Sequence, residues 1–178
     1  MNTHGEIEFL GTGTSTGVPL IGCNCEVCRS NDSKDKRLRA SAIVRINGIN
    51  ILEDPIEAKR HIGFLPEQPP VYPDMTVSEY LNFVYELKGV KLPREEHLSG
   101  IITSVRLSEV KNRLIKILSK GYKQRVGIAQ ALVGDPEIII FDEPTVGLDP
   151  KQILEVRNLI RTLAKNHTVI LSTHILAE

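Results

Sequence analysis

Two adjacent acids follow an apolar run in the second half of the chain. The letters IIIF occupy residues 138–141, and Asp142 and Glu143 come directly after them. If the run is a buried strand of a parallel sheet, both carboxylates lie at its carboxyl end, where α/β sheets bind ligands. There the first acid can hold Mg²⁺, and the second can orient or deprotonate an attacking water. By itself the pattern fits equally well a strand that runs into a polar turn.

Further polar motifs surround these acids in the sequence. The letters LSKGYKQR begin at residue 118 and predict the start of a helix, with Ser119 and Gly121 in its first turn. Free backbone N–H groups at a helix N-terminus, together with a hydroxyl, form a site for an anion. GLD at residues 147–149 and STH at residues 172–174 follow in order. The acids therefore belong to a series of motifs, which favours a functional interpretation.

The three cysteines of the chain form a separate cluster. Cys23, Cys25 and Cys28 follow the spacing C-x-C-x-x-C. In a reducing compartment this spacing favours metal binding over a disulfide. The trio can supply three of the four ligands of a structural zinc. The alternative is three reduced thiols in a surface loop, and the sequence leaves both open.

The segments that must position these motifs alternate between helix and strand patterns. Thr76 and Glu79 form a capping box that predicts a helix ending at about Lys88. The other predicted elements are a helix after Pro93 with Leu98, Ile101, Ile102 and Val105 on one face, a helix over residues 119–133, a strand over 138–141, a helix from Asp149 to about Lys165, and a strand over 168–172. Strand, helix and strand predict a βαβ unit in a parallel sheet, with a helical insertion before it.

Composition is that of a globular chain and argues against several classes of protein. Of the 178 residues, 41% are hydrophobic and 25% are charged. Lys+Arg and Asp+Glu balance at 22 each, so we expect no nucleic-acid partner and no general attraction to an anionic membrane. No apolar run approaches the ~18 residues that a membrane span needs. The first residues lack the basic and apolar regions of a signal peptide, so we expect a cytoplasmic protein.

Residues from about 46 to 178 resemble an ABC-transporter ATPase, specifically the exporter branch related to gliding-motility and copper-processing transporters. The letters LSKGY resemble the signature motif LSGGQ, with Ser119 and Gly121 retained. Asp142 and Glu143 match the Walker B aspartate and the catalytic glutamate of this family.

Three further motifs match the same family. GLD, which ends in Asp149, resembles the D-loop, and His174 resembles the switch histidine that contacts the γ-phosphate. GFLPE, which ends in Glu67, matches the Q-loop, although the family usually has glutamine at this position. The resemblance assigns catalysis to Glu143 and His174, nucleotide binding to Glu67, Ser119, Gly121, Asp142 and Asp149, and Mg²⁺ binding to Asp142.

The resemblance also implies cofactors and partners. In this family two cassettes sandwich two ATP molecules with Mg²⁺, and each signature motif caps the nucleotide held by the other copy. A matching assembly would be a symmetric homodimer. The Q-loop and the helical insertion contact a separate integral membrane permease. The chain would then be cytoplasmic and peripheral to the inner face of the cell membrane.

The phosphate-binding P-loop is the missing part of this cassette. No window of the 178 residues satisfies its pattern G-x-x-x-x-G-K-[ST], and the glycine-rich stretch 11–17 lacks a lysine. We therefore expect a partial P-loop NTPase fold, with parallel strands plus a helical insertion, that binds ATP poorly. We expect no ATPase activity from the isolated chain. The family also continues into further strands beyond residue 178.

Residues 6–53 resemble the start of a metallo-β-lactamase-fold hydrolase of the phosphodiesterase branch. The resemblance rests on FLGTGTSTGVP at residues 9–19, the cysteine trio, and RLRAS at residues 37–41. The catalytic metals of that family need an H-x-H-x-D-H cluster, which this chain lacks. A zinc-dependent phosphodiesterase is therefore disfavoured. In that family a distant histidine supplies the fourth ligand to the zinc that the cysteines bind.

The two resemblances predict a chimeric organisation. Residues 1–53 would form a short β-rich, metallo-β-lactamase-like fragment from a different fold, and residues 54–178 an ABC ATPase fragment. The segments meet near a predicted hairpin with an Asn-Gly turn at residues 47–48, a pattern that suits both parents. Two functions stay open: an ATP-binding subunit of an exporter with a defective nucleotide site, or a non-catalytic chimeric remnant.

Overall fold

A computed structural model of the chain describes residues 5–11, 18–20, 22–36, 41–46, 49 and 53–173. The predicted turn at residues 47–48, the glycine-rich residues 12–17 and His174 lie outside the described residues. The chain divides into two compact units, Met1–Pro55 and Ile56–Glu178. Each unit is described by itself below.

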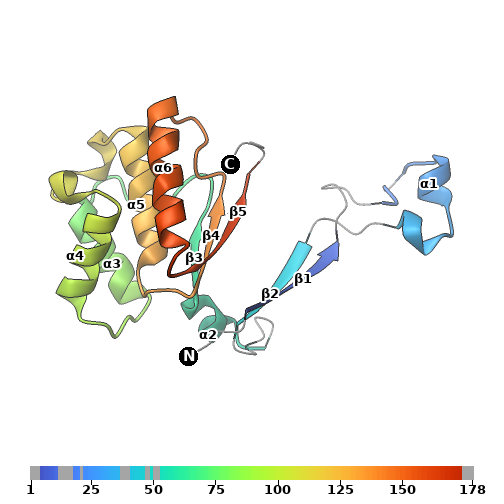
Figure 1. Cartoon of the computed structure of the whole chain (residues 1–178), viewed down its shortest axis with the longest axis horizontal. Helices are drawn as coiled ribbons and strands as arrows, with labels where there is room; N and C mark the ends of the chain where they lie inside the picture. The colour runs from blue at the N-terminus through green and yellow to red at the C-terminus, as the bar shows by residue number, and fades with distance from the viewer. Residues whose placement is uncertain are drawn as a thin grey trace. The chain divides into compact units, whose positions relative to one another are not determined.

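The described residues of the first unit form a two-stranded antiparallel sheet and two short helices (Figure 1). Strand β1 (Gly5–Gly11) pairs with β2 (Ser41–Ile46), with Gly5 opposite Ile46. The helices, α1 (Glu26–Arg29) and η1 (Ser33–Asp35), lie between the strands in the sequence. The cysteine cluster therefore lies in the segment that connects β1 to β2.

The second unit is built on a three-stranded parallel sheet with the order β3-β4-β5. Its strands are β3 (Ile62–Leu65), β4 (Ile138–Asp142) and β5 (Thr168–Ser172). Both strands that the sequence predicted are confirmed, and they pair in parallel as expected for a βαβ unit. Strand β3 was not predicted, because a four-residue run that contains a glycine gives no clear period.

In the described part of the second unit, four helices begin and end close to the predicted residues, and three shorter helices were not predicted. Their bounds are α2 Pro55–Arg60, α3 Val77–Leu87, α4 Arg94–Ser104, η2 Ser108–Val110, η3 Ile115–Ile117, α5 Lys120–Leu132 and α6 Pro150–Leu163. The capping box of α3 is formed: Thr76 N–H donates to Glu79 Oε2 over 2.8 Å, and Glu79 N–H donates to Thr76 Oγ1 over 3.2 Å. None of the helices in the described residues is long and apolar enough to span a bilayer.

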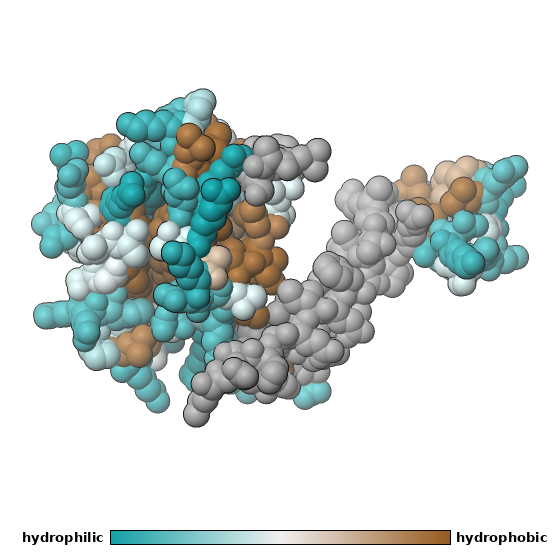
Figure 2. Space-filling model, in the orientation of Figure 1, coloured by the Kyte–Doolittle hydropathy of each residue, from teal (hydrophilic) through white to brown (hydrophobic). Residues whose placement is uncertain are grey.

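Helix α5 lies directly against strand β3 because two glycines leave room for it. A Cβ at Gly63 would lie 2.2 Å from the carbonyl oxygen of Ala131, and a Cβ at Gly127 would lie 2.6 Å from Leu65 Cδ1. Apolar side chains of β3, β4 and helices α3 to α6 then form one buried cluster. Figure 2 shows that the surface of this unit is mixed, with brown hydrophobic patches among mostly hydrophilic residues. The fold therefore holds the start of α5 and the end of β4 on one rigid frame.

Candidate functional site

The two acids lie at the carboxyl edge of the parallel sheet, as the sequence predicted. Asp142 is the last residue of β4, is half-buried, and lies opposite Ser172 of β5. Glu143 follows it, and its backbone N–H donates to the Ser172 carbonyl oxygen over 2.9 Å. Thr173 Oγ1 lies 3.5 Å from Glu143 Oε2. Strand β5 therefore fixes the backbone of both acids, and Thr173 contacts the carboxylate of Glu143.

Glu143 has an unusual backbone conformation. Its φ is +48°, in the left-handed region that residues with a Cβ rarely adopt. The hydrogen bond to Ser172 holds it from one side, and Val146 N–H closes a turn by donating to the Glu143 carbonyl oxygen over 3.2 Å. Residues kept in such conformations cluster at functional sites, where surrounding structure fixes a side chain against local preference.

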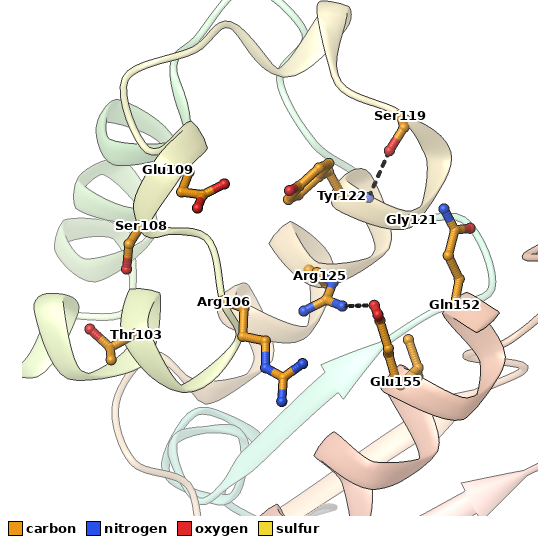
Figure 3. Close-up of a pocket in the computed structure, with 11 residues that line it drawn as sticks. Thr103, Arg106, Ser108, Glu109, Ser119, Gly121, Tyr122, Arg125, Gln152 and Glu155 are labelled. Atoms are coloured by element: carbon orange, nitrogen blue, oxygen red, sulfur yellow. Dashed lines mark hydrogen bonds and ion pairs between the residues drawn. The ribbon is translucent and has the colours of Figure 1, made fainter.

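The start of α5 presents the serine and the glycine differently. Ser119 is exposed, and its Oγ caps the helix by accepting from Tyr122 N–H over 3.4 Å (Figure 3). Gly121 is buried, because the side chain of Gln152 from α6 lies over it. A Cβ at Gly121 would lie 2.8 Å from Gln152 Cδ. The glycine is thus required by the close approach of a second helix.

The loop before α6 contacts the start of α5 as well. Gly147 has φ +69°, and a Cβ there would lie 2.0 Å from Lys120 Nζ. Asp149 caps α6 by accepting from Gln152 N–H over 2.9 Å. The cap at Asp149 therefore fixes the backbone of Gln152, whose side chain lies over Gly121.

An ion pair continues this link one turn further along both helices. Arg125 Nη2 lies 2.5 Å from Glu155 Oε2, and the two side chains are 12% and 32% exposed. Arg125 Nη1 also donates to the Val105 carbonyl oxygen over 3.1 Å. A cavity of about 510 Å³ opens beside the pair, between the helical insertion and the first turns of α5 and α6 (Figure 3). Sequence reasoning missed Gln152, Arg125 and Glu155, because nothing local marks helices that will meet.

Glu67 lies on the other side of the α5 N-terminus. It is exposed, and it lines a cavity of about 210 Å³ together with Lys120, Lys123 and Gln124 of α5. Two lysines and one carboxylate therefore share a small hollow. The structure thus brings the predicted Q-loop next to the predicted signature helix, with Asp142 and Glu143 at the end of the strand beside β3.

In the first unit, the three thiols lie close together. The Sγ atoms of Cys23, Cys25 and Cys28 are all within 4.8 Å of one another. Leu20 N–H lies 3.4 Å from Cys28 Sγ, so a backbone donor already points to one sulfur. The backbone N–H of Cys28, followed by the neighbouring thiols, lowers the pKa of Cys25. The pKa of Cys28 is instead raised: the Leu20 N–H lowers it, but the Cys25 thiol and burial outweigh that effect. Three clustered sulfurs are a donor set that a metal ion can use.

The residues of this site fit only part of a nucleotide with its Mg²⁺. Carboxylate oxygens at a strand end are ligands that Mg²⁺ prefers, and the exposed hydroxyl and backbone of the α5 N-terminus suit an anion. A cradle for the phosphates is the part that does not fit, because no G-x-x-x-x-G-K-[ST] window occurs in the sequence.

Comparison with protein families identifies the class. The family described as "ABC transporter" matches residues 33–146, which is more than half of the chain, so the chain belongs to this family. The matched range begins upstream of residue 46, where the resemblance was expected to start. The fold is a partial ATP-binding cassette of the P-loop NTPase type, and the class is that of ATP-binding domains of transporters.

Curated relatives and solved structures agree with this class. The bacitracin transport ATP-binding protein BcrA of Bacillus licheniformis is 39% identical over 140 residues, which are 78% of this chain and 45% of that protein. The lantibiotic transport ATP-binding protein SrtF of Streptococcus pyogenes is 37% identical over 120 residues, 67% of this chain and 51% of that protein. The ABC transporter ced-7 of Caenorhabditis elegans is 35% identical over 136 residues, 76% of this chain and 8% of that protein. The chain thus spans about half or less of the length of these relatives.

Among solved structures, the ATP-binding subunit of an ABC transporter superposes with a TM-score of 0.62 at 31% identity, over 79% of this chain and 59% of that chain. The cbiO1 protein of Clostridium perfringens, described as part of the transporter complex cbiONQ, gives a TM-score of 0.64 at 26% identity, over 75% of this chain and 56% of that chain.

Proposed function

We propose that this chain is the ATP-binding subunit of an ABC exporter, of the gliding-motility and copper-processing type, with a defective nucleotide site of its own. One observation carries the proposal. Glu67 and Gly147 lie beside the start of α5, and the acid pair lies at the carboxyl edge of the sheet, but no phosphate-binding window occurs in the 178 residues.

The size of the defect follows from the missing bonds. A P-loop supplies about three charge-assisted hydrogen bonds to the phosphates, each contributing ~1.5–3 kcal/mol. Their loss removes about 4–9 kcal/mol of binding free energy, which is roughly three to six orders of magnitude in ATP affinity. Surviving motifs act on a triphosphate that is already held, so they do not offset this loss.

Within the site, each residue has a proposed role. Glu143 is the base that orients or deprotonates water, and Asp142 holds Mg²⁺. Asp149 caps α6 and Ser119 caps α5, so both also fix the first turns that face a nucleotide. Bound ATP with Mg²⁺ supplies the phosphoanhydride bond and charge neutralisation.

Three further roles belong to the assembled complex. We assign contact with the γ-phosphate to His174. Ser119 and Gly121 would cap a nucleotide that a second cassette holds, in a symmetric homodimer or a mixed pair. Glu67, in the hollow with Lys120 and Lys123, would respond to the permease through the Q-loop.

The partners follow from the same family. BcrA and SrtF carry the names of transport ATP-binding proteins, and cbiO1 is described as part of a transporter complex. By analogy, an integral membrane permease is the proposed partner of this chain. The chain would then be cytoplasmic and peripheral to the membrane.

Phosphate release at millimolar ATP with Mg²⁺ tests the proposal. We expect the chain alone to be no faster than its Glu143→Gln variant. Mixed with an intact homologous cassette, the chain should raise turnover, because its signature helix completes the site that the partner's P-loop fills. Turnover by the chain alone that Glu143→Gln abolishes would contradict the defective site. If the chain does not change the turnover of the intact cassette, the result would favour the alternative that the chain is a non-catalytic chimeric remnant.

A second proposal concerns residues 1–53, which we assign to a metallo-β-lactamase-like fragment, with residues 54–178 forming the ABC fragment. The sulfur atoms within 4.8 Å of one another favour one zinc ion on Cys23, Cys25 and Cys28. Elemental analysis of the purified chain should return one zinc, and none for Cys25→Ser. Two tightly held metals per chain, or zinc retained by Cys25→Ser, would contradict this.

A further inference from the structure

A groove lies on the second unit at the end of α5 opposite the signature motif. It has a volume of about 700 Å³ and is formed by α2, by the end of α3 with the loop that follows, and by the turn after α5. Pockets for small ligands are concave, mostly apolar and about 300–1,000 Å³ in volume. The groove meets all of these criteria, and none of the site residues described above lines it.

Its walls are aliphatic. The apolar residues that line it are Ile56, Leu87, Val90, Leu92 and Val133. Leu87 and Ile56 are 73% and 71% exposed, the two highest values among the large hydrophobic residues in the described part of the chain. No aromatic side chain is among the described lining residues, so the groove lacks the surface on which a nucleobase would stack. A flexible hydrocarbon chain is the ligand that such walls fit best.

Its rim is cationic. Four basic residues line the groove, namely Lys59, Arg60, Lys88 and Lys91. The acids are Glu86 and Asp135, and Glu86 is paired with Arg94, outside the groove, over 3.0 Å. Arg60 pairs with Glu57 over 2.8 Å at an exposed position, where such a pair contributes little and gives way easily. The excess of positive charge favours an anionic head group.

Lys88 is the basic lining residue whose ammonium group is held by hydrogen bonds to the backbone. Its Nζ donates to the Val133 carbonyl oxygen over 2.8 Å and lies 3.4 Å from the Gln130 carbonyl oxygen. An ammonium group has three donors, so two carbonyl partners leave one donor. Gly89 and Gly134, which also line the groove, have φ of +61° and +97°, in the left-handed region that favours glycine.

We propose that this groove binds one monomeric, single-chain anionic amphiphile, with its hydrocarbon tail along the aliphatic walls and its carboxylate or phosphate head at the basic rim. A hollow of this volume admits one tail, whereas a flat bilayer surface would contact only the exposed rim. The site is separate from the nucleotide motifs, so it stands whether or not the proposed function holds.

Calorimetric titration of the full 178-residue chain with dodecanoate and with dodecyl phosphate, both below their micelle concentrations, tests the proposal. We expect saturable binding with one site per chain for both. Dodecyltrimethylammonium, with the same tail and opposite charge, should bind at least about tenfold more weakly, a difference of ~1.4 kcal/mol. Equal affinity for the cationic and anionic probes would overturn the proposal.

Matched variants locate the site. Leu87→Glu and Lys91→Glu should each weaken dodecanoate binding at least about tenfold. Their controls are Ile117→Glu and Lys116→Glu, which change a residue that is 66% exposed and its neighbour on a surface outside the groove. All four positions are exposed, and thermal unfolding checks that each variant folds. Controls that weaken binding as much as the groove variants, or binding to anionic phosphatidylglycerol vesicles without binding of monomers, would overturn the proposal.

Discussion

The two ends of helix α5 are held in different ways. At its N-terminus, Ser119 is exposed and Gly121 is covered by one side chain from α6. At its C-terminus, Lys88 donates to the Val133 carbonyl oxygen, and Gly134 N–H donates to His97 Nε2 over 3.0 Å. One end therefore leaves polar groups near solvent, while Lys88 and His97 of the helical insertion hold the other.

This difference has a physical reason. A helix leaves unsatisfied N–H groups at its start and unsatisfied carbonyls at its end. The start of α5 keeps such groups near solvent, where an anion can use them. The end uses a lysine and a histidine from the helical insertion to satisfy the backbone. A helix fixed firmly at one end can present its other end precisely.

Filling the space above Gly121 should have the largest effect. In Gly121→Val the new side chain would overlap Gln152 and displace either the signature turn or α6. We expect the stimulation of an intact cassette to fall about 100-fold, equivalent to ~2.7 kcal/mol. The double variant with Gln152→Ala should recover part of this loss because the space reopens. Equal rates for the single and double variants would show that Gln152 does not position this turn.

The next largest effect concerns Lys88. Burial lowers the pKa of its ammonium group to about 8. Between pH ~8 and ~9.5 the unfolded lysine stays protonated and the folded one does not, so the unfolding free energy rises with pH. Over these 1.5 pH units the full effect is about 1.6 kcal/mol, and we expect a rise of about 1 kcal/mol after discounting for partial exposure.

Chemical denaturation across this range measures the rise for Lys88. The window ends before tyrosines of the unfolded chain ionise near their ordinary pKa of 10.0. Lys88→Met should show a smaller rise than the wild type, because only the thiols, whose ordinary pKa is 9.0, then titrate in this range. Lys116→Met, at an exposed pair, should match the wild type. A wild-type profile that is flat or falling would contradict the assignment.

Removing the cap of α5 should have a smaller effect. Ser119→Ala loses the hydroxyl that accepts from Tyr122 N–H. We expect the unfolding free energy to fall by about 0.5–1 kcal/mol, and Ser119→Asp to restore it, as for other helix caps. Thr76→Ala, which breaks the complete capping box of α3, is the internal comparison and should cost more. The prediction fails if Ser119→Ala is the more damaging of the two.

The smallest effect should come from His97. Burial, with the charge of Lys88, lowers its pKa below the ordinary 6.5 against the opposing charge of Asp135. As pH falls below 6.5, the unfolded chain takes up a proton before the folded one does, so stability decreases. Thermal unfolding between pH 7 and 5.5 should show this decrease, and His97→Phe should reduce it. An unchanged slope would mean that other groups govern the decrease.

Local chemistry made much of the second unit predictable. Thr76 with Glu79 marks a capping box within four residues of sequence, and Asp149 before Pro150 marks the start of α6. Helix α6 ends at Leu163, two residues before the predicted Lys165, because helix ends fray without a strong stop signal. The cysteine cluster is local too, since Cys23, Cys25 and Cys28 are neighbours in the sequence.

The sequence by itself determined the motifs, their order and the elements that carry them, because caps, turns and apolar periods act over a few residues. It could not determine that Gln152 covers Gly121, that Arg125 pairs with Glu155, or that Lys88 closes the end of α5 from 45 residues away. Those contacts depend on how helices cross in space, and a lysine or glutamine on a helix surface has the same local pattern whether it meets water or another helix. Tertiary packing decides whether such a side chain meets water or another helix. A buried carbonyl or a crowded glycine restricts its neighbours only when the chain has folded.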